Sequence, residues 1–333
     1  MCHVHRRQDL PMTEPSAFLA WRPPGKELRF FQGNEKGLYR FFFVDFWQRE
    51  PRVFNLNEVQ TWPSEDTFLR LSQKPLYQSK DDYLQLLRRS VDILKKGELR
   101  KVVHSRAEEF SGPVNPRLVF EALAEQHPEA TVYLFSSPQT GTWVGATPET
   151  LLLKDKQRLY TMSLAGTLSQ PEAEFGAKEK EEQRLVTDFI FEVLHDDPQI
   201  DQIEIRSGTE MKTGQLRHLL NEITAHCRPD YPVEVLAARL HPTPAVAGLP
   251  REKAMPYLAQ HEAYQRSFYS GYFGLVQGGS ASFYVNLRCA QFHPDGQSLY
   301  AGGGITALSI PEKEWQETEA KLKPLKTAIG LAQ

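Results

Sequence analysis

Short segments rich in β-branched and aromatic residues follow one another closely in the middle of the chain. Four of them cover 131–136, 142–145, 150–154 and 159–164, and Gly and Pro separate them. Strands bounded by such turns are typical of hairpins, in which neighbouring strands run antiparallel. The sequence therefore predicts an antiparallel sheet as the framework of this protein.

Further strands are expected on both sides of this region. They are predicted at 99–106, 272–277, 281–291 and 297–301. Gly278-Gly279, between the second and third of these, is a hairpin signature. Residues 1–80 alternate aromatic-rich runs with Pro and Gly, and we expect them to form strands and loops along one edge of a sheet.

Apolar residues at helical spacing mark the intervening segments. Helices are predicted at 81–98, 116–126, 179–195 and 213–225, the first ended by Gly97. A last helix should open at 309–312, where Ser-Ile-Pro-Glu forms a capping box with an early proline, and reach Pro324. Hairpins with helices between them predict an α+β fold. No Pro/Gly/Ser-rich linker divides the chain, so we expect a single domain over 1–333.

The bulk composition excludes several classes of function. A formal net charge of −3 over 333 residues gives no reason to expect nucleic acid or an anionic membrane as a partner. No GxGxxG or Walker motif is present, so a nucleotide cofactor is not expected. The three cysteines lack CxxC spacing and predict neither a disulfide framework nor a zinc site. Without a signal-peptide core or an apolar run of about 20 residues, we expect a cytoplasmic protein.

The last third of the chain brings together groups that bind anions and metals. It holds a proline-rich loop at 240–250, Arg288 in an expected strand, the glycine run 302–304, and a helix with carboxylates and Lys321. Anionic ligands are bound by arginine, lysine and free backbone N–H groups, and divalent metals by clustered carboxylates. This segment therefore predicts a site where a metal and an acidic substrate meet.

Carboxylates on two helices are candidates for the metal. Glu182 lies along the apolar stripe of its helix, where an uncompensated charge is costly, although a partly exposed helix-end glutamate is the alternative. Glu314, Glu317 and Lys321 share one face of the last helix. A solvated salt-bridge face would also explain them, but the glycine run just upstream lets a backbone approach a ligand.

Lys101 and Glu149 are two further polar residues that could take part in chemistry. Alternation along the strand places Lys101, Val103 and Ser105 on one face, and a lysine in a closed pocket can serve as a base. A solvated strand-edge lysine is the alternative. Glu149 precedes an apolar strand and, taken alone, indicates only a loop acid. His218, inside a predicted helix, could be structural or functional.

In chain order, these motifs resemble those of the chorismate-utilising enzymes, which include isochorismate synthase, salicylate synthase, anthranilate synthase component I and aminodeoxychorismate synthase component I. The motifs that carry the resemblance are Lys101-Val-Val-His-Ser-Arg106, Gly145-Ala-Thr-Pro-Glu149, Leu164-Ala-Gly-Thr167, the helix with Glu182, the loop 241–250, Arg288, and Gly302 to Lys321. The resemblance implies an α+β fold whose large antiparallel β-sheets pack as a sandwich-like core with helices on the outside. It implies a catalytic core at 81–333, whereas 1–80 match loosely.

The resemblance also implies roles for individual residues. Lys101 corresponds to the base that activates water for attack at C2 of the ring, and Glu149 to the acid that protonates the departing C4 hydroxyl. Glu182 and Glu317 resemble the two glutamates that bind Mg²⁺, with Glu314 nearby and acting through water. The residues implied in substrate binding are Gly166, Thr167, His218, Ala245, Val246, Tyr269, Arg288, Tyr300, Gly302, Gly303 and Lys321.

Three positions favour isochorismate synthase within the family. Lys101 is typical of water-using members, since the ammonia-using anthranilate synthases generally carry glutamine there. Ala165 argues against aminodeoxychorismate synthases, where lysine is typical, and Ala245 against salicylate and anthranilate synthases, where threonine is usual. Gln183 is a departure, because relatives often have histidine there. A salicylate synthase is the nearest alternative, and a non-catalytic chorismate-binding subunit is the alternative from another class.

The same resemblance carries expectations about ligands and partners. We expect chorismate as the substrate, Mg²⁺ as the cofactor, and a monomer. No glutaminase subunit is expected, because water replaces ammonia as the nucleophile. Menaquinone, siderophore and salicylate pathways all stay open as the destination of the product.

Overall fold

The computed structural model describes residues 17–49, 51–168, 173–213 and 216–333. The helices in these residues are α1 (Lys80–Lys95), α2 (Pro116–Gln126), α3 (Ala177–His195), α4 (Val233–Leu240), α5 (Arg251–His261) and α6 (Pro311–Leu331), with a 3₁₀ turn at Glu65–Thr67. The strands are β1 (Phe18–Arg22), β2 (Arg29–Gly33), β3 (Tyr39–Val44), β4 (Arg52–Val59), β5 (Lys101–Ser111), β6 (Thr131–Ser137), β7 (Gly141–Thr147), β8 (Thr150–Asp155), β9 (Arg158–Leu168), β10 (Ile200–Thr213), β11 (Leu216–Cys227), β12 (Gly248–Leu249), β13 (Tyr272–Gln277), β14 (Ser280–Val285), β15 (Cys289–His293) and β16 (Gly296–Ile305).

The strands pair in the order β10-β11-β9-β8-β14-β13-β3-β4-β2-β1-β6-β7-β15-β16-β5-β12, and the neighbours run antiparallel. Strands β4, β2 and β1 separate β3 from β6, yet the rings of Phe41 in β3 and Phe135 in β6 are 4.6 Å apart. Tyr133 in β6 and Phe273 in β13 are 4.2 Å apart. The sheet therefore folds over on an aromatic core, which confirms the predicted α+β fold with its sandwich-like antiparallel core.

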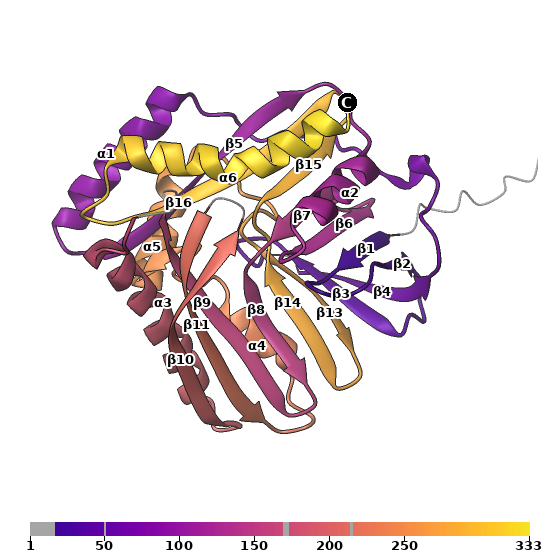
Figure 1. The fold of residues 1–333 in the computed structure, drawn as a ribbon, viewed down its shortest axis with the longest axis horizontal. Coiled ribbons are helices and arrows are strands. Elements are labelled where there is room, and N and C mark those ends of the chain that lie inside the picture. The colour runs from indigo at the N-terminus through magenta and orange to yellow at the C-terminus, as the bar shows by residue number, and fades with distance from the viewer. Residues whose placement is uncertain (1–16, 50, 169–172, 214–215) are drawn as a thin grey trace, which may run out of the picture.

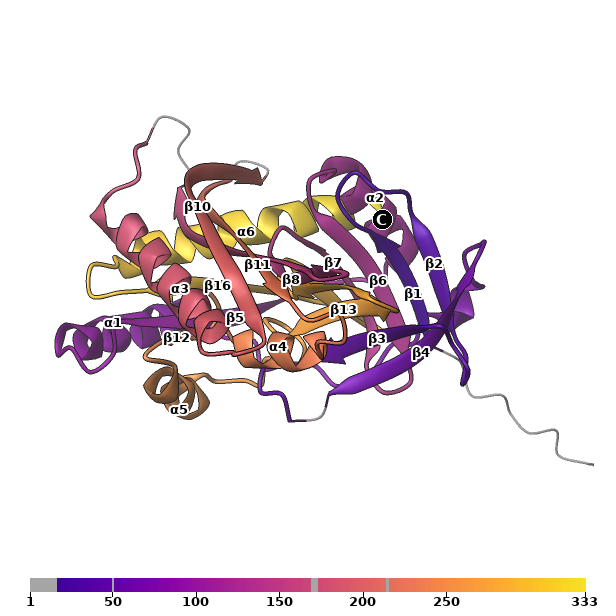
Figure 2. The ribbon, with the colours of Figure 1, turned by 90° about the horizontal axis from the view of Figure 1, so that it is seen from below.

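The helices cover the outside of this folded sheet. Helix α6 packs on β16 and lies beside α1 and α2, and α3 packs on β9, β10 and β11 (Figure 1). Figure 2 shows α6 and α5 on opposite sides of the β5–β16 pair. The two faces of β5 are therefore covered by different elements.

Helix α1 shows how local sequence sets the ends of an element. The Ser79 side chain accepts a hydrogen bond from the backbone N–H of Asp82 at 3.1 Å, which caps the first turn. Tyr83 and Leu87 are buried on the inner face. Gly97 follows with φ +83°, a left-handed conformation that glycine adopts without a steric cost. The predicted helix ended by Gly97 is confirmed.

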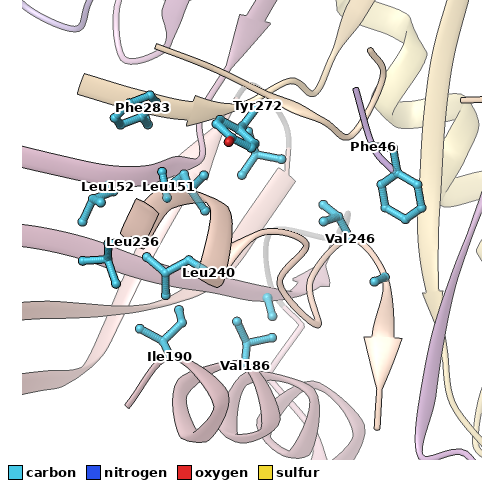
Figure 3. Close-up of a cluster of buried hydrophobic side chains, with 14 of the residues drawn as sticks. Phe46, Leu151, Leu152, Val186, Ile190, Leu236, Leu240, Val246, Tyr272 and Phe283 are labelled. Atoms are coloured by element: carbon cyan, nitrogen blue, oxygen red, sulfur yellow. The ribbon is translucent and has the colours of Figure 1, made fainter. Parts of the chain in front are cut away.

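Packing of α3 fixes the helix that carries Glu182. Val186 and Ile190 are almost fully buried in the cluster that contains Leu236 and Leu240 of α4 (Figure 3). Burial of one such side chain contributes about 1.5–3 kcal/mol. Because Glu182 precedes Val186 by one helical turn, this contact also orients its carboxylate toward the sheet.

The helix predicted at 213–225 is wrong, because this segment is strand β11, paired with both β10 and β9. Leu219, Leu220 and Ile223 recur at helical spacing, which explains the error. Pairing on two sides outweighs a local preference of this kind. The helical position expected for His218 is therefore a strand position.

Two other predictions about strands also need correction. Strands β1 to β4 lie between β13 and β6, in the middle of the strand order and not at an edge of the sheet. The single strand predicted at 281–291 is divided into β14 and β15, with residues 286–288 between them. Arg288 therefore lies outside the strands, and its φ of +47° is one that few residues other than glycine adopt.

The last helix differs from the prediction at both ends. Ile310 occupies the N-cap position without a side-chain cap, and the Ser309 hydroxyl accepts from the backbone N–H of Thr306 instead. The predicted proline in the first turn is present. The helix continues past Pro324 to Leu331, because Leu325 and the apolar residues beyond it are buried against the α2 side of the core.

Ile190→Ala tests the packing of α3. We expect the free energy of unfolding to fall by about 2–5 kcal/mol, because truncation leaves a cavity between α3 and α4. Urea denaturation followed by far-UV circular dichroism measures the change. Val235→Ala, at a position of α4 that is 52% exposed, is the control and should change stability by less than about 0.5 kcal/mol. Equal losses in the two variants would contradict this account.

Candidate active site

One cavity collects residues from β5, β9, β11, β16, α3, α6 and the loops before β12 and β13. The volume that the centre of a water molecule can reach inside this cavity is about 90 Å³. One water needs only about 10–15 Å³ of this volume. All but three of the residues predicted for the site line this cavity. They are Lys101, Glu149, Gly166, Glu182, His218, Ala245, Val246, Tyr269, Arg288, Tyr300, Gly302, Glu317 and Lys321.

Of the other three predicted residues, Gly303 and Glu314 are not part of the cavity lining, and the third cannot be placed. Thr167 belongs to β9, but its side chain lies outside the part of the chain that the structure describes. Alternation along β16 turns Gly302 and Gly304 to the cavity and Gly303 away from it. Glu314 is 3% exposed, and its Oε2 lies 3.7 Å from the position that a Cβ on Gly303 would take. Gly303 and Glu314 are therefore neighbours of the cavity wall.

A buried ion pair joins β5 to α3 inside the cavity. Lys101 is fully buried, and its Nζ lies 2.8 Å from Oε1 of Glu182. Val103 and Ser105 line the cavity beside Lys101, as the predicted alternation requires. A Cβ at Gly304 would lie 2.5 Å from Oε1 of Glu182 and 2.8 Å from Cε of Lys101. Only glycine at this position leaves room for the pair.

A second lysine–glutamate pair comes from α6. Lys321 Nζ lies 2.7 Å from Oε1 of Glu317, one helical turn away, and donates to the carbonyl oxygen of Gly302 at 2.9 Å. Strand β15 pairs with β16 only as far as Leu299. Beyond this point, at the glycine run, Lys321 of α6 bonds to the backbone of β16. The hydrogen bond from Lys321 to the Gly302 carbonyl holds α6 against β16 beside the cavity.

Glu149 lies in the turn between β7 and β8 and is 6% exposed. Burial raises the pKa of Glu149 from its ordinary value of 4.5 to about 7, although the positive charges of Lys101 and Lys321 act in the opposite direction. A carboxyl group with a pKa near 7 is partly protonated at neutral pH and can donate its proton to a leaving group.

Arg288 and His218 meet on another wall of the cavity. Nη2 of Arg288 lies 3.3 Å from Nε2 of His218. Burial, together with the charges of Arg288 and Lys321, lowers the pKa of His218 well below its ordinary value, so the imidazole is neutral and Nε2 accepts. Burial lowers the pKa of Arg288 to about 10, which still leaves the guanidinium charged at neutral pH. The site thus offers a fixed cation to an anionic ligand.

Two stacked tyrosines form the apolar side of the cavity. The rings of Tyr269 and Tyr300 are 5.4 Å apart with an interplanar angle of 15°, and Trp143 stacks behind Tyr300 at 5.4 Å. The Tyr300 hydroxyl donates to Oε1 of Gln291 at 3.0 Å, which satisfies its buried polar end. A flat ring that carries acidic groups therefore finds both an aromatic surface and cations here.

The cavity wall also contains residues that were not predicted for the site. They are Val103, Ser105, Pro148, Leu164, Ala165, Arg266, Ser270, Leu287, Ala301 and Gly304. Alternation from Lys101 could have identified Ser105, and alternation from Gly302 could have identified Gly304. No local pattern marks Arg266, which follows α5 in a segment without regular structure.

The carboxylates of Glu182 and Glu317 both line the cavity, and carboxylate oxygens are the donors that Mg²⁺ prefers. In the described part of the chain, no three His, Cys, Asp or Glu side chains come together as a ready metal site. Each of the two glutamates is paired with a lysine. The donor set fits Mg²⁺, which is usually held by one or two carboxylates and completes its shell with water and substrate oxygens.

Comparison with known proteins places this chain among the chorismate enzymes. Residues 42–330 match the family model described as chorismate binding enzyme. The chain belongs to this family. It is 32% identical over 255 residues to the salicylate biosynthesis isochorismate synthase of Pseudomonas aeruginosa, covering 72% of this chain and 53% of that protein. It is 29% identical over 249 residues to isochorismate synthase EntC of Escherichia coli, covering 70% of this chain and 63% of that protein. It thus spans only part of these relatives.

Solved structures of the family share the fold. Menaquinone-specific isochorismate synthase MenF of Escherichia coli matches with a TM-score of 0.80 at 22% identity, over 94% of this chain and 88% of that one. Anthranilate synthase component I of Streptococcus pneumoniae matches with a TM-score of 0.71 at 16% identity, over 97% and 95%. In the described residues, no helix has the length and apolar character needed to cross a membrane. The cytoplasmic location stays a prediction.

Glu149→Gln tests the raised pKa of this carboxyl group. Native Glu149 binds its proton up to about pH 7, whereas the unfolded chain releases it near 4.5. The native state therefore holds more protons in this window, and the wild type loses stability as the pH rises through it. Each unit of pKa shift corresponds to about 1.4 kcal/mol.

The glutamine variant cannot ionise, so its stability relative to the wild type should grow by an amount on the order of 3 kcal/mol from pH 4 to pH 8. Urea denaturation at a series of pH values measures this difference. A difference that stays constant over the whole range would show that Glu149 titrates normally.

Proposed function

We propose that this protein is an isochorismate synthase, which converts chorismate to isochorismate reversibly and with Mg²⁺. The observation that carries the proposal is the placement of Lys101 and Glu149 in one cavity, together with two cations that suit the substrate's carboxylates. Both relatives named above are isochorismate synthases by name. The activity itself is inferred, since the chain spans only part of each relative.

The reaction divides among the residues of the cavity. Arg288 and Lys321 bind the carboxylates of chorismate and orient the ring. Lys101 acts as the free amine: it takes a proton from water as the water oxygen bonds to C2 and becomes the ammonium that pairs with Glu182. Glu149 gives a proton to the C4 hydroxyl, which leaves as water, and the ring double bonds shift between the two carbons. One hydroxyl enters and one leaves, so the product is an isomer of the substrate.

Glu182 and Glu317 would hold Mg²⁺, with Glu314 beside them and acting through water. When bound, the ion would counter the charge of the ring carboxylate and absorb electron density during the displacement. The carboxylates of these two residues and the Gly304 position that admits Glu182 support this assignment. The remaining chemistry is that of the chain's own acid, base and cations.

Residue identities in the cavity favour isochorismate formation over the reactions of other family members. Ala165 and Ala245 both line the cavity, where other family members typically carry lysine and threonine. A salicylate synthase, which also eliminates pyruvate, is the nearest alternative. A non-catalytic chorismate-binding subunit is less favoured, because binding alone does not require the buried pair of Lys101 and Glu182 beside Glu149. A monomer without a glutaminase partner is part of the proposal.

The decisive assay incubates the protein with chorismate and MgCl₂ in water enriched in oxygen-18. We expect isochorismate that carries one heavy oxygen at C2, because the entering hydroxyl comes from water. Chromatography with mass spectrometry identifies the product, and a lactate dehydrogenase assay detects pyruvate. Accumulation of salicylate and pyruvate would establish the lyase alternative, and the recovery of unchanged chorismate would favour the binding subunit.

Lys101→Ala should reduce kcat by about 10²–10⁴-fold, the usual contribution of a general base. Lys154→Ala is the matched control, because Lys154 is also buried at 5% exposure but donates to the carbonyl oxygen of Pro229, away from the cavity. Its kcat should stay near that of the wild type. Undiminished turnover in Lys101→Ala would remove this lysine from the mechanism.

Glu182→Gln and Glu317→Gln should abolish Mg²⁺-stimulated turnover and weaken the binding of Mn²⁺ by at least about tenfold, since each removes a charged oxygen ligand. Electron paramagnetic resonance of free Mn²⁺ measures binding independently of activity. Glu181→Gln, at a half-exposed position of α3 paired with Arg184, is the control. Tight Mn²⁺ binding in both cavity variants would contradict the metal assignment.

A further inference from the structure

Arg266 is a cation of the cavity wall that the proposed reaction does not use. It is 1% exposed, and its guanidinium lies 4.1 Å from the centre of the Phe46 ring. A charge buried this deeply is costly unless other groups compensate it. The partners of Arg266 therefore decide what the residue does.

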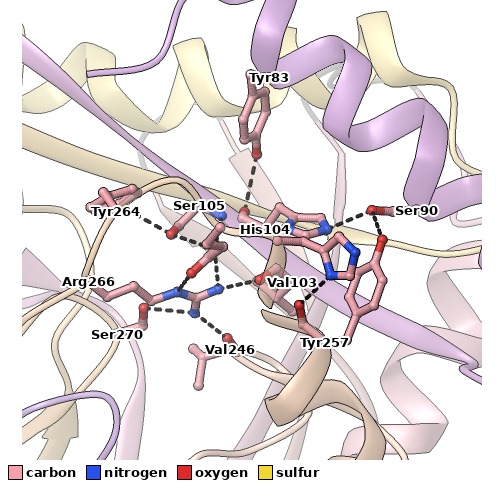
Figure 4. Close-up of polar contacts among 12 residues, drawn as sticks. Tyr83, Ser90, Val103, His104, Ser105, Val246, Tyr257, Tyr264, Arg266 and Ser270 are labelled. Carbon is pink, nitrogen blue, oxygen red and sulfur yellow. Dashed lines mark hydrogen bonds and ion pairs between the residues drawn. The ribbon is translucent and has the colours of Figure 1, made fainter. Parts of the chain in front are cut away.

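All five N–H donors of the Arg266 guanidinium are used within the protein (Figure 4). Nε and Nη2 each donate to one carboxylate oxygen of Glu262 at 2.7 Å. Nη1 donates to the carbonyl oxygen of Val246 at 2.8 Å and to Oγ of Ser270 at 3.3 Å. Nη2 also donates to the carbonyl oxygen of Val103. Arg266 therefore has no donor left for a ligand.

Glu262 extends this network to β5. Its Oε1 accepts from the backbone N–H and from the hydroxyl of Ser105, both at 2.9 Å. The Ser105 hydroxyl also lies 2.9 Å from the hydroxyl of Tyr264. The Glu262 side chain is 3% exposed, so the carboxylate and the guanidinium neutralise each other away from solvent. The Glu262–Arg266 pair is thus a saturated bridge.

This bridge ties together three walls of the cavity. The first is β5, on which Val103 and Ser105 share the face of Lys101. The second is the loop between α4 and β12, which contains Ala245 and Val246. The third is the segment with Tyr269, whose backbone N–H donates to the carbonyl oxygen of Arg266 at 3.0 Å. Each wall therefore holds a residue assigned to the reaction: Lys101 on the first, Val246 on the second and Tyr269 on the third.

We propose that the Glu262–Arg266 ion pair is the positioning element of the reaction. It holds the strand with Lys101 and the wall at Val246 at the separation that the substrate ring requires, and it does so without contacting the substrate. This inference rests on the proposed conversion of chorismate. Arg288 differs in kind, since its hydrogen bond within the described residues goes to His218 and the rest of its guanidinium is left for an anion.

Lysine cannot replace arginine in this bridge. A lysine ammonium has three donors on a point charge, whereas the planar guanidinium presents five in a fixed fork. Arg266→Lys keeps the charge opposite Glu262, but its three donors can replace at most three of the five hydrogen bonds that Arg266 makes. A displacement of about 1 Å in a reacting group can cost about 10²-fold in rate.

The test compares the full-length Arg266→Lys and Arg106→Lys variants. Arg106 is a close match: it is 2% exposed, lies on β5, pairs with Glu108 and Glu319, and is 4.0 Å from the Trp315 ring. It differs in its partners: Arg106 lies on the face of β5 opposite the cavity, and its hydrogen bonds go to Glu108, Thr318 and Glu319 instead of to Glu317 or Lys321, the α6 residues that line the cavity. Both variants lose a buried guanidinium, so both should have a lower Tm.

Steady-state assays with chorismate are run well below both melting transitions. We expect Arg266→Lys to reduce kcat by about 10²-fold with KM within about threefold of the wild type, and Arg106→Lys to keep kcat near the wild-type value. Glu262→Gln, which leaves Arg266 without its counter-charge, should reduce kcat in the same selective way and serves if Arg266→Lys does not fold.

Three results would overturn the proposal. A rise in KM with unchanged kcat would make Arg266 a substrate-binding residue, and equal losses of kcat in Arg266→Lys and Arg106→Lys would make its role merely structural. An unchanged Arg266→Lys enzyme would remove any role. A wild type without isochorismate formation would refute the reaction itself, which separates that failure from a failure of the positioning role.

Discussion

The ion pair between Lys101 and Glu182 is the interaction on which the rest of the site depends. It joins the first residue of β5 to α3 across the backbone of β16, and it can form because residue 304 is glycine. Removal of one partner from such a buried pair typically costs about 3–5 kcal/mol, because the other charge stays buried without compensation. The glycine run is part of a strand, and the absence of side chains there lets the pair approach the backbone.

The charges that line the cavity are close to balance before a ligand enters. Glu262 neutralises Arg266, and the remaining cations, Lys101, Arg288 and Lys321, exceed the carboxylates of Glu182 and Glu317 by one charge. Burial leaves Glu149 only partly ionised at neutral pH, which reduces this excess. In the proposed reaction the substrate brings two negative charges and Mg²⁺ brings two positive ones, so that together they leave the balance unchanged. Either ligand alone would disturb it, and unbalanced charge is costly in a medium of low dielectric constant. This argues that metal and substrate favour each other's binding.

Most elements could be predicted because their signals are local. Helix α2 and strand β13 have the predicted bounds, since caps, prolines and turn glycines lie within a few residues of the ends they set. Strand β11 could not be predicted, because pairing with β9 and β10 determined its conformation against helical spacing. The position of β1 to β4 in the middle of the sheet likewise depends on β6 and β13, which are distant in sequence.

The same distinction applies to the site. Lys101, Glu149 and Lys321 could be placed in the cavity because the motifs that contain them resemble those of the chorismate-utilising enzymes, whereas the residues alone left a solvated lysine, a loop acid and a salt-bridge face open. Arg266 could not, because its role follows from where its donors go, and the acceptors at Val103 and Val246 are brought to it only by the folded sheet. A motif therefore predicts groups that line the cavity. The groups that hold them in place must be found from the saturation of their hydrogen bonds, since a cation with every donor occupied has none left for a ligand.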